Sequence, residues 1–398
     1  MRIGIYLQLP GRPLGPGGAE RCAATLAAAL AVRHDVDFVH HPPAIDLAHL
    51  GAFCGLDLSR LKSRCVESGD PPQLRTSNPW VRYREARAWN AALSAPYDLF
   101  VAFTHALPSF CHARRGALRI LFPLVDRQSL WPWHHTLDGT RKTLLNRLNR
   151  LYAAWEWRRR FAGYQAAAAN SRFTERWVRR RWAIDCSTVY PPVELDVPDR
   201  EKRNLILSVG RFSTSSPRKN QLEMVLAFRE LSGKGGLTGW SYATAGGLRN
   251  DPEEGAYFER VRRAAADGSV QVLPNLERER LLDLYGEAKI FWHAAGLGED
   301  EEARPEFMEH FGIVTVEAMG AGCVPIVIRK GGQPEIVEHG VSGFLWDSIE
   351  ELKEYTDLLA RDDGLRARMA TAARARALRF SRAAYVNAML ALLEPLLA

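Results

Sequence analysis

The chain has 398 residues, of which 46% are apolar and 25% are charged. A single hydrophobic core stops growing at roughly 250 to 300 residues, so this length predicts two domains of similar size. The ordinary composition excludes a disordered, collagen-like or coiled-coil chain. The longest apolar runs, such as residues 26–32, fall short of the roughly 18 residues that a spanning helix needs, so no transmembrane span is expected.

Neither a leader peptide nor a disulfide framework is predicted. Met1-Arg2 leads directly into the apolar run from Ile3 to Leu7, without the separate basic, apolar and small-residue regions of a secretory signal. We therefore expect the mature chain to begin here, in the cytosol. The six cysteines are scattered without a CxxC pair, which favours small buried hydrophobic side chains over a disulfide or zinc site.

The positive charge is concentrated in one segment. Between Arg141 and Arg181, twelve Lys or Arg stand against two acids, a local balance of +10 within a total of +7, so the remainder of the chain carries −3. A basic patch on a slightly acidic body indicates that this segment faces an anionic partner. A nucleic-acid partner is not favoured, because no nucleic-acid-binding motif is present.

In the first half of the chain, apolar strands alternate with helical stretches. Strands are expected at residues 3–7, 36–39, 99–103, 120–124 and 166–169, and the first helix at residues 18–32. Such alternation predicts a parallel α/β sheet. Pro191-Pro192 and the polar stretch 196–203 interrupt the pattern, so the domain boundary is expected there.

The second half repeats the same alternation. Strands are expected at residues 204–210, 241–245, 270–273, 290–293 and 324–328, with helices between them. After Ser381, a residue type typical of helix N-caps, Tyr385, Met389 and Leu392 recur at helical spacing and predict a terminal helix. The expected division is residues 1–196, residues 197–379 and a terminal helix at residues 380–398.

A glycine-rich turn, Gly15-Pro-Gly-Gly-Ala-Glu20, separates the first strand from the first helix. Glycines there allow backbone N–H groups to approach a phosphate at a helix N-terminus. The turn lacks the Gly-Lys-Ser/Thr ending of a P-loop and the spacing of a dinucleotide fold. Plain turn chemistry is therefore an equal alternative.

Two cations stand near the start of the second domain. Arg211 follows the strand at 204–210, and Lys219 comes just before the helix expected at 221–231. Open α/β sheets bind ligands at the carboxyl ends of their strands, where Arg offers a planar fork for phosphate oxygens and Lys a point charge. Taken alone, the pair could also be two solvated loop residues.

The most informative segment runs from Glu309-His-Phe-Gly-Ile-Val-Thr-Val-Glu317 to Pro325 and on to Gly331-Gly332. Two glutamates flank a glycine at an expected helix start. A diphosphate fits a helix N-terminus, and carboxylates accept hydrogen bonds from sugar hydroxyls.

With these motifs, the chain resembles the retaining glycosyltransferases of family 4 over nearly its full length. The resemblance implies the GT-B fold: two Rossmann-like α/β domains facing across a cleft, with a C-terminal helix that crosses back to the first domain. It further implies that Glu317 binds the nucleotide ribose, that Glu309 binds the transferred sugar, and that Arg211 and Lys219 neutralise the diphosphate. The other donor-binding positions that it implies are Gly17, Gly18, Asn275, Phe311, Gly312, Ile313 and Val314. The resemblance also implies transfer without a metal ion, and the sequence has no aspartate pair flanked by metal-ligand residues. The nucleotide-sugar is a substrate, so no cofactor is expected.

Within this family the chain is most similar to the cytosolic α-1,2-mannosyltransferases that extend lipid-linked oligosaccharides. Glu-His-Phe-Gly-Ile at 309–313, residues 151–155 and residues 170–174 carry this likeness. Many family members have a histidine before Phe-Pro on a first-domain strand, whereas this chain has Leu121. His105 and Asp126 are the alternative acceptor-binding candidates.

The basic segment also contains many tryptophans. Six of the eleven lie between Trp131 and Trp182, and Leu144, Leu148, Leu151 and Trp155 recur at helical spacing among arginines. Tryptophan and arginine on an amphipathic helix favour a membrane interface or an anionic headgroup. A core-facing helix with a solvated basic side is the alternative.

We therefore expect a retaining glycosyltransferase that takes a sugar, first of all mannose from GDP-mannose, to a glycan or lipid-linked glycan. The enzyme is expected to be cytoplasmic, at the membrane surface. The alternatives are a UDP-sugar donor with a soluble acceptor, and a GT-B-fold epimerase or phosphorylase.

Overall fold

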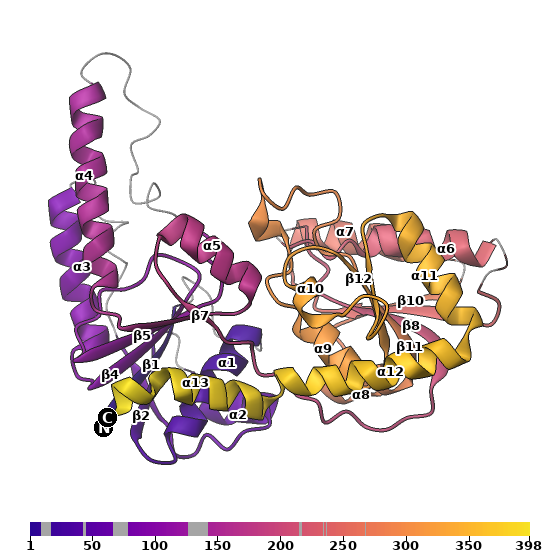
Figure 1. The fold of residues 1–398 in the computed structure, drawn as a ribbon, viewed down its shortest axis with the longest axis horizontal. Helices are drawn as coiled ribbons and strands as arrows, with labels where there is room; N and C mark the ends of the chain where they lie inside the picture. The colour runs from indigo at the N-terminus through magenta and orange to yellow at the C-terminus, as the bar shows by residue number, and fades with distance from the viewer. Residues whose placement is uncertain are drawn as a thin grey trace. The chain divides into compact units, whose positions relative to one another are not determined.

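A computed structural model describes residues 1–8, 17–42, 45–66, 79–125, 142–214, 217–233, 235, 237–266 and 268–398. It divides the chain into two compact units (Figure 1). Unit 1 comprises Met1–Pro192 together with Tyr385–Ala398, and unit 2 comprises Val193–Ala384. The terminal helix thus joins unit 1 from Tyr385 onward. Among the described residues, no helix is both long and apolar enough to cross a bilayer.

Unit 1 contains a seven-stranded sheet with the order β3-β2-β1-β4-β5-β6-β7, and all its strand pairs are parallel. Its elements are β1 (Arg2–Gln8), α1 (Gly18–Leu30), β2 (Asp35–His40), α2 (Leu47–Cys54), β3 (Lys62–Cys65), α3 (Pro79–Ser94), β4 (Leu99–Thr104), β5 (Arg115–Ile120), α4 (Lys142–Phe161), β6 (Ala166–Ala169), α5 (Arg172–Trp182), β7 (Ser187–Thr188) and α13 (Arg382–Leu397).

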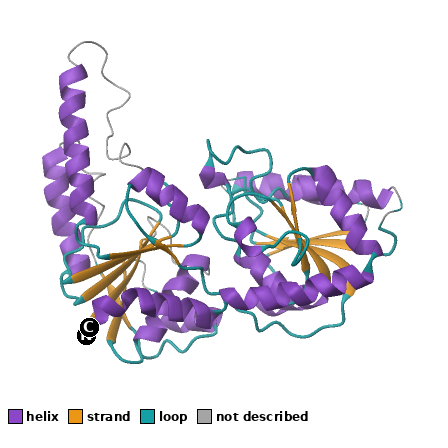
Figure 2. Cartoon of the chain, in the orientation of Figure 1, coloured by secondary structure: helices purple, strands orange, loops and turns teal. Residues whose placement is uncertain are grey.

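Alternating side chains of these strands fill two cores, one on each face of the sheet. Ile3 and Ile5 of β1 belong to a core that includes residues of α1, α2 and α13. Tyr6, between Ile5 and Leu7, belongs to the opposite core, with residues of α3, α4 and α5. Figure 2 shows this arrangement as a sheet between two layers of helices. Period-two alternation in buried strands is therefore what places three helices on each face.

Unit 2 contains a six-stranded parallel sheet with the order β10-β9-β8-β11-β12-β13. Its elements are β8 (Arg203–Val209), α6 (Gln221–Gly233), β9 (Ser241–Gly246), α7 (Pro252–Ala264), β10 (Val270–Pro274), α8 (Arg278–Glu287), β11 (Ala288–His293), α9 (Ile313–Gly320), β12 (Val324–Ile328), α10 (Gln333–Ile336), β13 (Phe344–Trp346), α11 (Ile349–Arg361) and α12 (Asp363–Ala377).

The sheet of unit 2 is also covered on both faces. Ile290 and Trp292 of β11 enter a large core shared with α6, α7, α11 and α12. Phe291 contacts the opposite side, where its ring lies 6.2 Å from that of Tyr285 in α8. The predicted α/β fold, with two parallel sheets, is confirmed.

The fifth strand lies elsewhere than the sequence predicts. We expected residues 120–124, but β5 is Arg115–Ile120. Arg119 hides the strand pattern because it is a charged residue at the centre of the sheet, fully buried, with Nη2 donating to the Val189 carbonyl at 2.6 Å. Pro123 lacks the N–H that a ladder requires.

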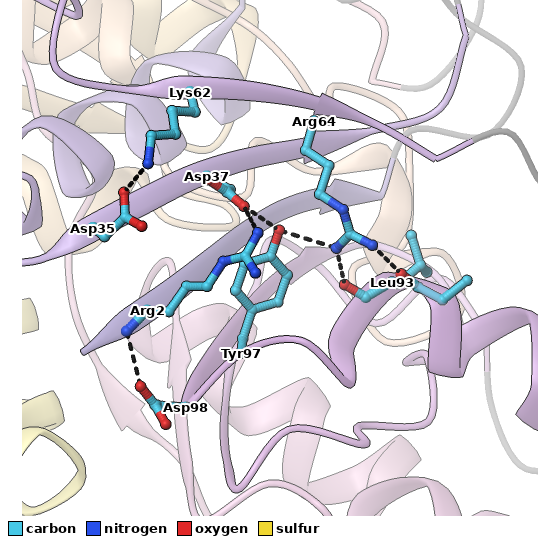
Figure 3. Close-up of polar contacts among 9 residues, drawn as sticks. Arg2, Asp35, Asp37, Lys62, Arg64, Leu93, Tyr97 and Asp98 are labelled. Atoms are coloured by element: carbon cyan, nitrogen blue, oxygen red, sulfur yellow. Dashed lines mark hydrogen bonds and ion pairs between the residues drawn. The ribbon is translucent and has the colours of Figure 1, made fainter.

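A polar cluster lies near the amino ends of the first strands of unit 1 (Figure 3). Asp37 Oδ2 accepts hydrogen bonds from the Tyr97 hydroxyl at 2.8 Å and from Arg2 Nη2 at 3.0 Å. Arg64 Nη1 donates to the same hydroxyl at 3.1 Å and Nη2 to the Ala92 carbonyl at 2.8 Å. These bonds join β1, β2, β3 and the end of α3, so the cluster stabilises one side of the sheet.

Candidate active site

The candidate site of unit 2 lies at the carboxyl ends of β8, β9, β10 and β11. A cavity of about 480 Å³ opens there. Parallel α/β sheets bind their ligands at this edge. The lining residues are Val209, Gly210, Arg211, Ala245, Gly246, Gly247, Asn275, Leu276, Leu281 and Val314.

Glycines allow the strand ends to come this close. A Cβ on Gly246 would lie 1.9 Å from the Gly210 carbonyl oxygen, and a Cβ on Gly210 would lie 2.6 Å from Lys219 Cγ. Non-bonded heavy atoms do not approach so closely, so any side chain at either position would push β8, β9 or Lys219 away. The two glycines therefore seat the Lys219 side chain directly beside the cavity lining.

Lys219 and His293 both contact Glu309. Lys219 Nζ lies 2.5 Å and His293 Nε2 lies 3.2 Å from the same carboxylate oxygen, Oε2. Burial alone would raise the pKa of Glu309, but the Lys219 ammonium and the His293 hydrogen bond bring it well below the usual range. Glu309 is therefore an anion at neutral pH, and its Oε1 has no hydrogen-bond partner in the described part of the chain.

A glycine turn packs against the backbone that carries Glu309. The Gly332 amide donates to the Glu309 carbonyl at 2.8 Å. A Cβ on Gly332 would lie 2.7 Å from Phe311 Cα, and one on Gly331 would lie 2.3 Å from the Glu309 carbonyl oxygen. Only glycine fits this approach, so the Gly331-Gly332 turn holds the Glu309 segment in place.

Helix α9 begins immediately after this segment. Gly312 precedes it with φ 121°, a conformation that favours glycine. Ile313 and Val314 are the first two helical residues, and the first amides of a helix have no intrahelical acceptor. These N–H groups form a positive end that suits an anion.

Glu317 lies one turn further along α9 and is buried. Its Oε1 accepts from Arg278 Nη2 at 2.8 Å, and its Oε2 accepts from the Tyr285 hydroxyl at 3.2 Å. Burial, together with the neighbouring Glu317 carboxylate, raises the pKa of Tyr285, so this phenol stays a donor. The Glu317 carboxylate is therefore held in place by Arg278 and Tyr285 of α8.

The other residues predicted to bind the donor differ in which of their groups are available to a ligand. Arg211 is exposed at the cavity, and in the described part of the chain its side chain forms no ion pair. Asn275 lines the cavity, but its amide is bonded to the backbone of Leu248, with Nδ2 donating at 3.1 Å and Oδ1 accepting at 2.8 Å. The Phe311 ring is buried and lies 5.4 Å from that of Phe380, so only the backbone of Phe311 is available to a ligand.

The remaining predicted residues belong to unit 1. Gly17 is the N-cap of α1 and Gly18 its first residue. The buried Glu20 carboxylate reaches back to Gly17, where a Cβ would lie 2.5 Å from Oε2. His105 follows β4, burial lowers its pKa to about 4, and its Nδ1 has no partner in the described part of the chain. Asp126 lies outside the described residues.

The basic segment contains both exposed and buried arginines. Arg158 and Arg159 are exposed, but Arg160 is buried and donates to the fully buried Glu156 from Nη2 at 2.7 Å. Trp157 is buried as well, and Trp155 is half-buried. The expectation of a basic surface therefore holds for Arg158 and Arg159 and fails for Arg160, which stabilises α4 from inside. Trp131 and Trp133 lie outside the described residues.

Sequence reasoning missed four residues of the site: His293, Gln333, Arg278 and Tyr285. His293 is the last residue of β11, and its position at a strand's carboxyl end was a signal that could have found it. Gln333 directly follows the Gly331-Gly332 turn that the sequence singles out, but no role was predicted for it. Arg278 and Tyr285 come from α8, which no short motif marks.

Two family models match the chain. The model described as "Glycosyltransferase Family 4" matches residues 16–197, and the model described as "Glycosyl transferases group 1" matches residues 196–376. Together they account for most of both units.

Relatives with named activities are similar to this chain. The GDP-Man:Man(3)GlcNAc(2)-PP-Dol alpha-1,2-mannosyltransferase of Homo sapiens is 30% identical over 234 residues, which cover 53% of this chain and 44% of that protein. The Alpha-1,3/1,6-mannosyltransferase ALG2 of Homo sapiens is 25% identical over 409 residues, which cover 91% of this chain and 89% of that protein. The chain spans about half the length of the first curated relatives that it matches.

Solved structures share the fold. A glycosyltransferase from Rickettsia africae ESF-5 has a TM-score of 0.66 at 16% identity, covering 100% of this chain and 98% of that one. WaaG, a glycosyltransferase involved in lipopolysaccharide biosynthesis, has a TM-score of 0.60 at 15% identity and covers 98% of both chains. This chain therefore belongs to the GT-B glycosyltransferases, with a first half that matches family 4 and a second half that matches group 1.

Proposed function

We propose that this enzyme transfers mannose from GDP-mannose to a glycan carried on a lipid, with retention at the anomeric carbon and without a metal ion. The relative named GDP-Man:Man(3)GlcNAc(2)-PP-Dol alpha-1,2-mannosyltransferase supports the donor and the acceptor, and the relative named Alpha-1,3/1,6-mannosyltransferase ALG2 supports mannose as the sugar. The observation that carries the transfer chemistry is the convergence of Lys219, Glu309 and the start of α9 beside the Arg211 cavity.

The nucleotide would occupy the cavity at the strand ends. Its volume of about 480 Å³ lies within the roughly 300 to 1,000 Å³ of ordinary small-molecule sites. The diphosphate would then meet the amides of Ile313 and Val314 and the side chains of Arg211 and Lys219. Each carboxylate oxygen has two lone pairs, so Glu317 can accept a ribose hydroxyl while it keeps Arg278.

The transferred sugar would contact Glu309. Its Oε2 is held by Lys219 and His293, which leaves Oε1 to accept a sugar hydroxyl. The Lys219 ammonium has three N–H donors, so it can hold Glu309 and a phosphate oxygen together. Negative charge grows on the departing diphosphate as the glycosidic bond breaks, and Arg211 and Lys219 are placed to stabilise it.

In unit 1, we assign acceptor binding to His105 and phosphate contact to Gly17 and Gly18. The neutral imidazole of His105, with its Nδ1 unpaired in the described part of the chain, supports contact with an acceptor hydroxyl. A glycine at a helix N-terminus supports close approach by a phosphate.

A donor panel tests the proposal. Thermal unfolding is measured with GDP-mannose, UDP-sugars, ADP-sugars and an oligonucleotide, because a true ligand raises Tm by mass action. We expect GDP-mannose to raise Tm and to be turned over when a lipid-linked oligosaccharide is added. A UDP-sugar that is turned over faster would reassign the donor, and lack of turnover with every nucleotide-sugar would refute the function.

Chelation tests metal independence separately. Turnover in EDTA should equal turnover without it, because two side-chain cations carry the charge that a metal would otherwise carry. Complete loss of turnover in EDTA, restored by a divalent cation, would overturn this part of the proposal.

We further propose that the exposed side of α4 meets an anionic membrane surface. Arg158 and Arg159 are exposed there, and Leu151 is 61% exposed on the same helix. A second cavity, of about 770 Å³, is lined by Arg158, Arg180 and Arg181 together with Trp157, Phe161 and Trp182. Each basic residue near an anionic bilayer contributes roughly 1 kcal/mol.

Vesicle binding tests this surface. Binding to vesicles with anionic lipid should fall as salt rises and should weaken in Arg158→Gln/Arg159→Gln, because salt screens exposed charges. Arg200→Gln, an exposed arginine of unit 2, serves as the control. If the enzyme does not bind such vesicles at low salt, a soluble acceptor becomes the better proposal.

A further inference from the structure

His293 is the one Glu309 partner that the proposed chemistry has not used. Its side chain is 3% exposed, and the residue is the last one of β11. Nε2 lies 3.2 Å from Glu309 Oε2, the oxygen that Lys219 also contacts. The carboxylate is therefore held from two elements, the loop before α6 and the end of β11.

The other ring nitrogen of His293 faces an amide. Gln333 Nε2 lies 3.4 Å from His293 Nδ1, and Gln333 is completely buried. An amide NH₂ can only donate, so Nδ1 must present its lone pair and the ring proton must stand on Nε2. Nε2–H then points at Glu309. The pair Gln333 and Glu309 thus selects one neutral tautomer of the imidazole.

Gln333 sits where a glycine makes room for it. A Cβ on Gly312 would lie 2.6 Å from Gln333 Nε2. Gln333 itself follows the Gly331-Gly332 turn that packs on the Glu309 backbone. The glycines of the motif therefore bring an amide to the far side of His293, and the Gln333 Oε1 has no partner in the described part of the chain.

We propose that His293 is a positioning residue for Glu309: as a neutral Nε2–H donor, with its tautomer set by Gln333, it keeps Glu309 Oε1 turned toward the transferred sugar. This inference rests on the proposed function, in which Glu309 binds that sugar. Lys219 cannot perform the task alone, because its ammonium is shared with the diphosphate. In the described part of the chain, the Nε2 of His293 contacts Glu309 and no other side chain.

Protonation of His293 would undo this arrangement. A proton on Nδ1 would face the NH₂ of Gln333, so two donors would oppose each other until the amide rotated. The charged groups that face the ring are Glu309, which favours the imidazolium, and Lys219, which opposes it; burial opposes it more strongly and lowers the pKa of His293. Turnover should therefore be steady near neutral pH and fall on the acid side as His293 gains its proton.

Three variants test the inference with the nucleotide-sugar that the wild-type enzyme turns over. His293→Phe keeps a ring but removes the donor, and kcat should fall by about tenfold to a hundredfold, with little change in the KM for the donor. His293→Gln keeps an N–H donor but cannot ionise, so kcat should recover to within about tenfold of wild type and the acid limb of the pH profile should disappear. Gln333→Glu places a carboxylate beside Nδ1, so the acid limb should move to higher pH.

His339→Gln is the matched control. His339 accepts from the Leu345 amide at 3.0 Å in the same unit, and its change should leave the pH profile unaltered. A histidine NMR titration gives a readout that needs no activity: the pKa of the His293 ring should rise in Gln333→Glu. If His293→Phe fails to fold, the other two variants still decide.

The outcomes separate the two proposals. A wild-type enzyme that turns over no nucleotide-sugar refutes the proposed function, and this inference with it. An active wild type whose acid limb persists in His293→Gln, or whose His293 pKa is unmoved in Gln333→Glu, refutes the inference alone.

Discussion

Two carboxylates, the buried Asp37 in unit 1 and the half-buried Glu309 in unit 2, are bonded in nearly the same way. One oxygen of each accepts from one cation and one neutral donor: Arg2 and Tyr97 for Asp37, Lys219 and His293 for Glu309. Their places in the sheets differ. Asp37 lies near the amino ends of its strands (Figure 3), whereas Glu309 lies among strand carboxyl ends, beside a helix N-terminus and a cavity.

This difference shows that a buried ion pair does not by itself indicate a ligand-binding site. The Asp37 side chain is 4% exposed and both of its donors also fix strands, so its bonds stabilise the fold. The Glu309 side chain is 17% exposed and keeps one oxygen without a partner in the described part of the chain. Position at the ligand-binding edge, together with unused hydrogen-bonding capacity, is what marks Glu309.

The largest expected effect separates these two carboxylates directly. Glu309→Gln should lower kcat by about a hundredfold or more, because a preorganised group at the reacting sugar is lost, and should also lower Tm, because Lys219 loses its anionic partner. Asp37→Asn should lower Tm and leave kcat unchanged. Steady-state kinetics and thermal unfolding of both variants check the comparison, which fails if Asp37→Asn lowers kcat as much as Glu309→Gln does.

Arg211→Ala should also lower turnover by about a hundredfold, through loss of charge stabilisation on the departing diphosphate. Arg211 has no ion pair in the described part of the chain, so its removal leaves no buried charge behind and should cost little stability. Arg200→Ala, which removes an exposed arginine paired with Asp283 at 2.8 Å, is the control. Near-normal kcat in Arg211→Ala would contradict its role.

Much of this site could be predicted from the sequence because its parts are local. The Glu309-to-Glu317 segment and the Gly331-Gly332 turn lie close together in the sequence, and Lys219 stands just before the helix predicted at residues 221–231. Strands β8, β9, β11 and β12 are also found where their apolar runs predict them.

The parts that could not be predicted depend on long-range packing. His293 and Gln333 are 40 residues apart and meet only because β11 and β12 are neighbours in the sheet. The short edge strand β3, Lys62–Cys65, contains mostly polar, exposed residues, so no apolar run marks it. The strand predicted at residues 120–124 was misplaced, because Arg119, a buried charge within β5, breaks the apolar pattern on which prediction relies.

Glu317 and Glu309 should also differ from one another. Glu317→Gln should weaken the binding of free nucleotide diphosphate by about tenfold, the loss of roughly one charged hydrogen bond, because its proposed partner is the ribose. It should also lower Tm, since Arg278 loses its buried anion. Glu309→Gln should leave free-nucleotide affinity nearly unchanged. Calorimetric titration of both variants decides, and equal losses would refute this division of roles.

Tyr97→Phe tests the amino-edge cluster with the smallest possible change. It removes the hydroxyl that donates to Asp37 and accepts from Arg64. The cost should be about 1.5 to 3 kcal/mol of stability, as for one buried hydrogen bond to a charged group. Unchanged kcat with a lower Tm is the expected result, and lower kcat at unchanged Tm would mean that this cluster serves the site.

The smallest effect concerns how stability changes with pH. Burial keeps the pKa of His293 below the ordinary value of about 6.5. As the pH falls from neutral through about 6.5, the unfolded chain therefore takes up a proton at this residue that the folded chain does not, and stability is lost. The slope from one such group is at most about 1.4 kcal/mol per pH unit.

Glu309 does not contribute to this slope near neutral pH, because its lowered pKa contributes stability that is lost only below about pH 4.5. His293→Gln should therefore have a shallower fall of Tm between pH 7 and pH 5 than wild type, while His105, whose pKa is also lowered by burial, acts equally in both proteins. Parallel Tm curves for the two proteins would mean that folding leaves the pKa of the His293 imidazole unchanged.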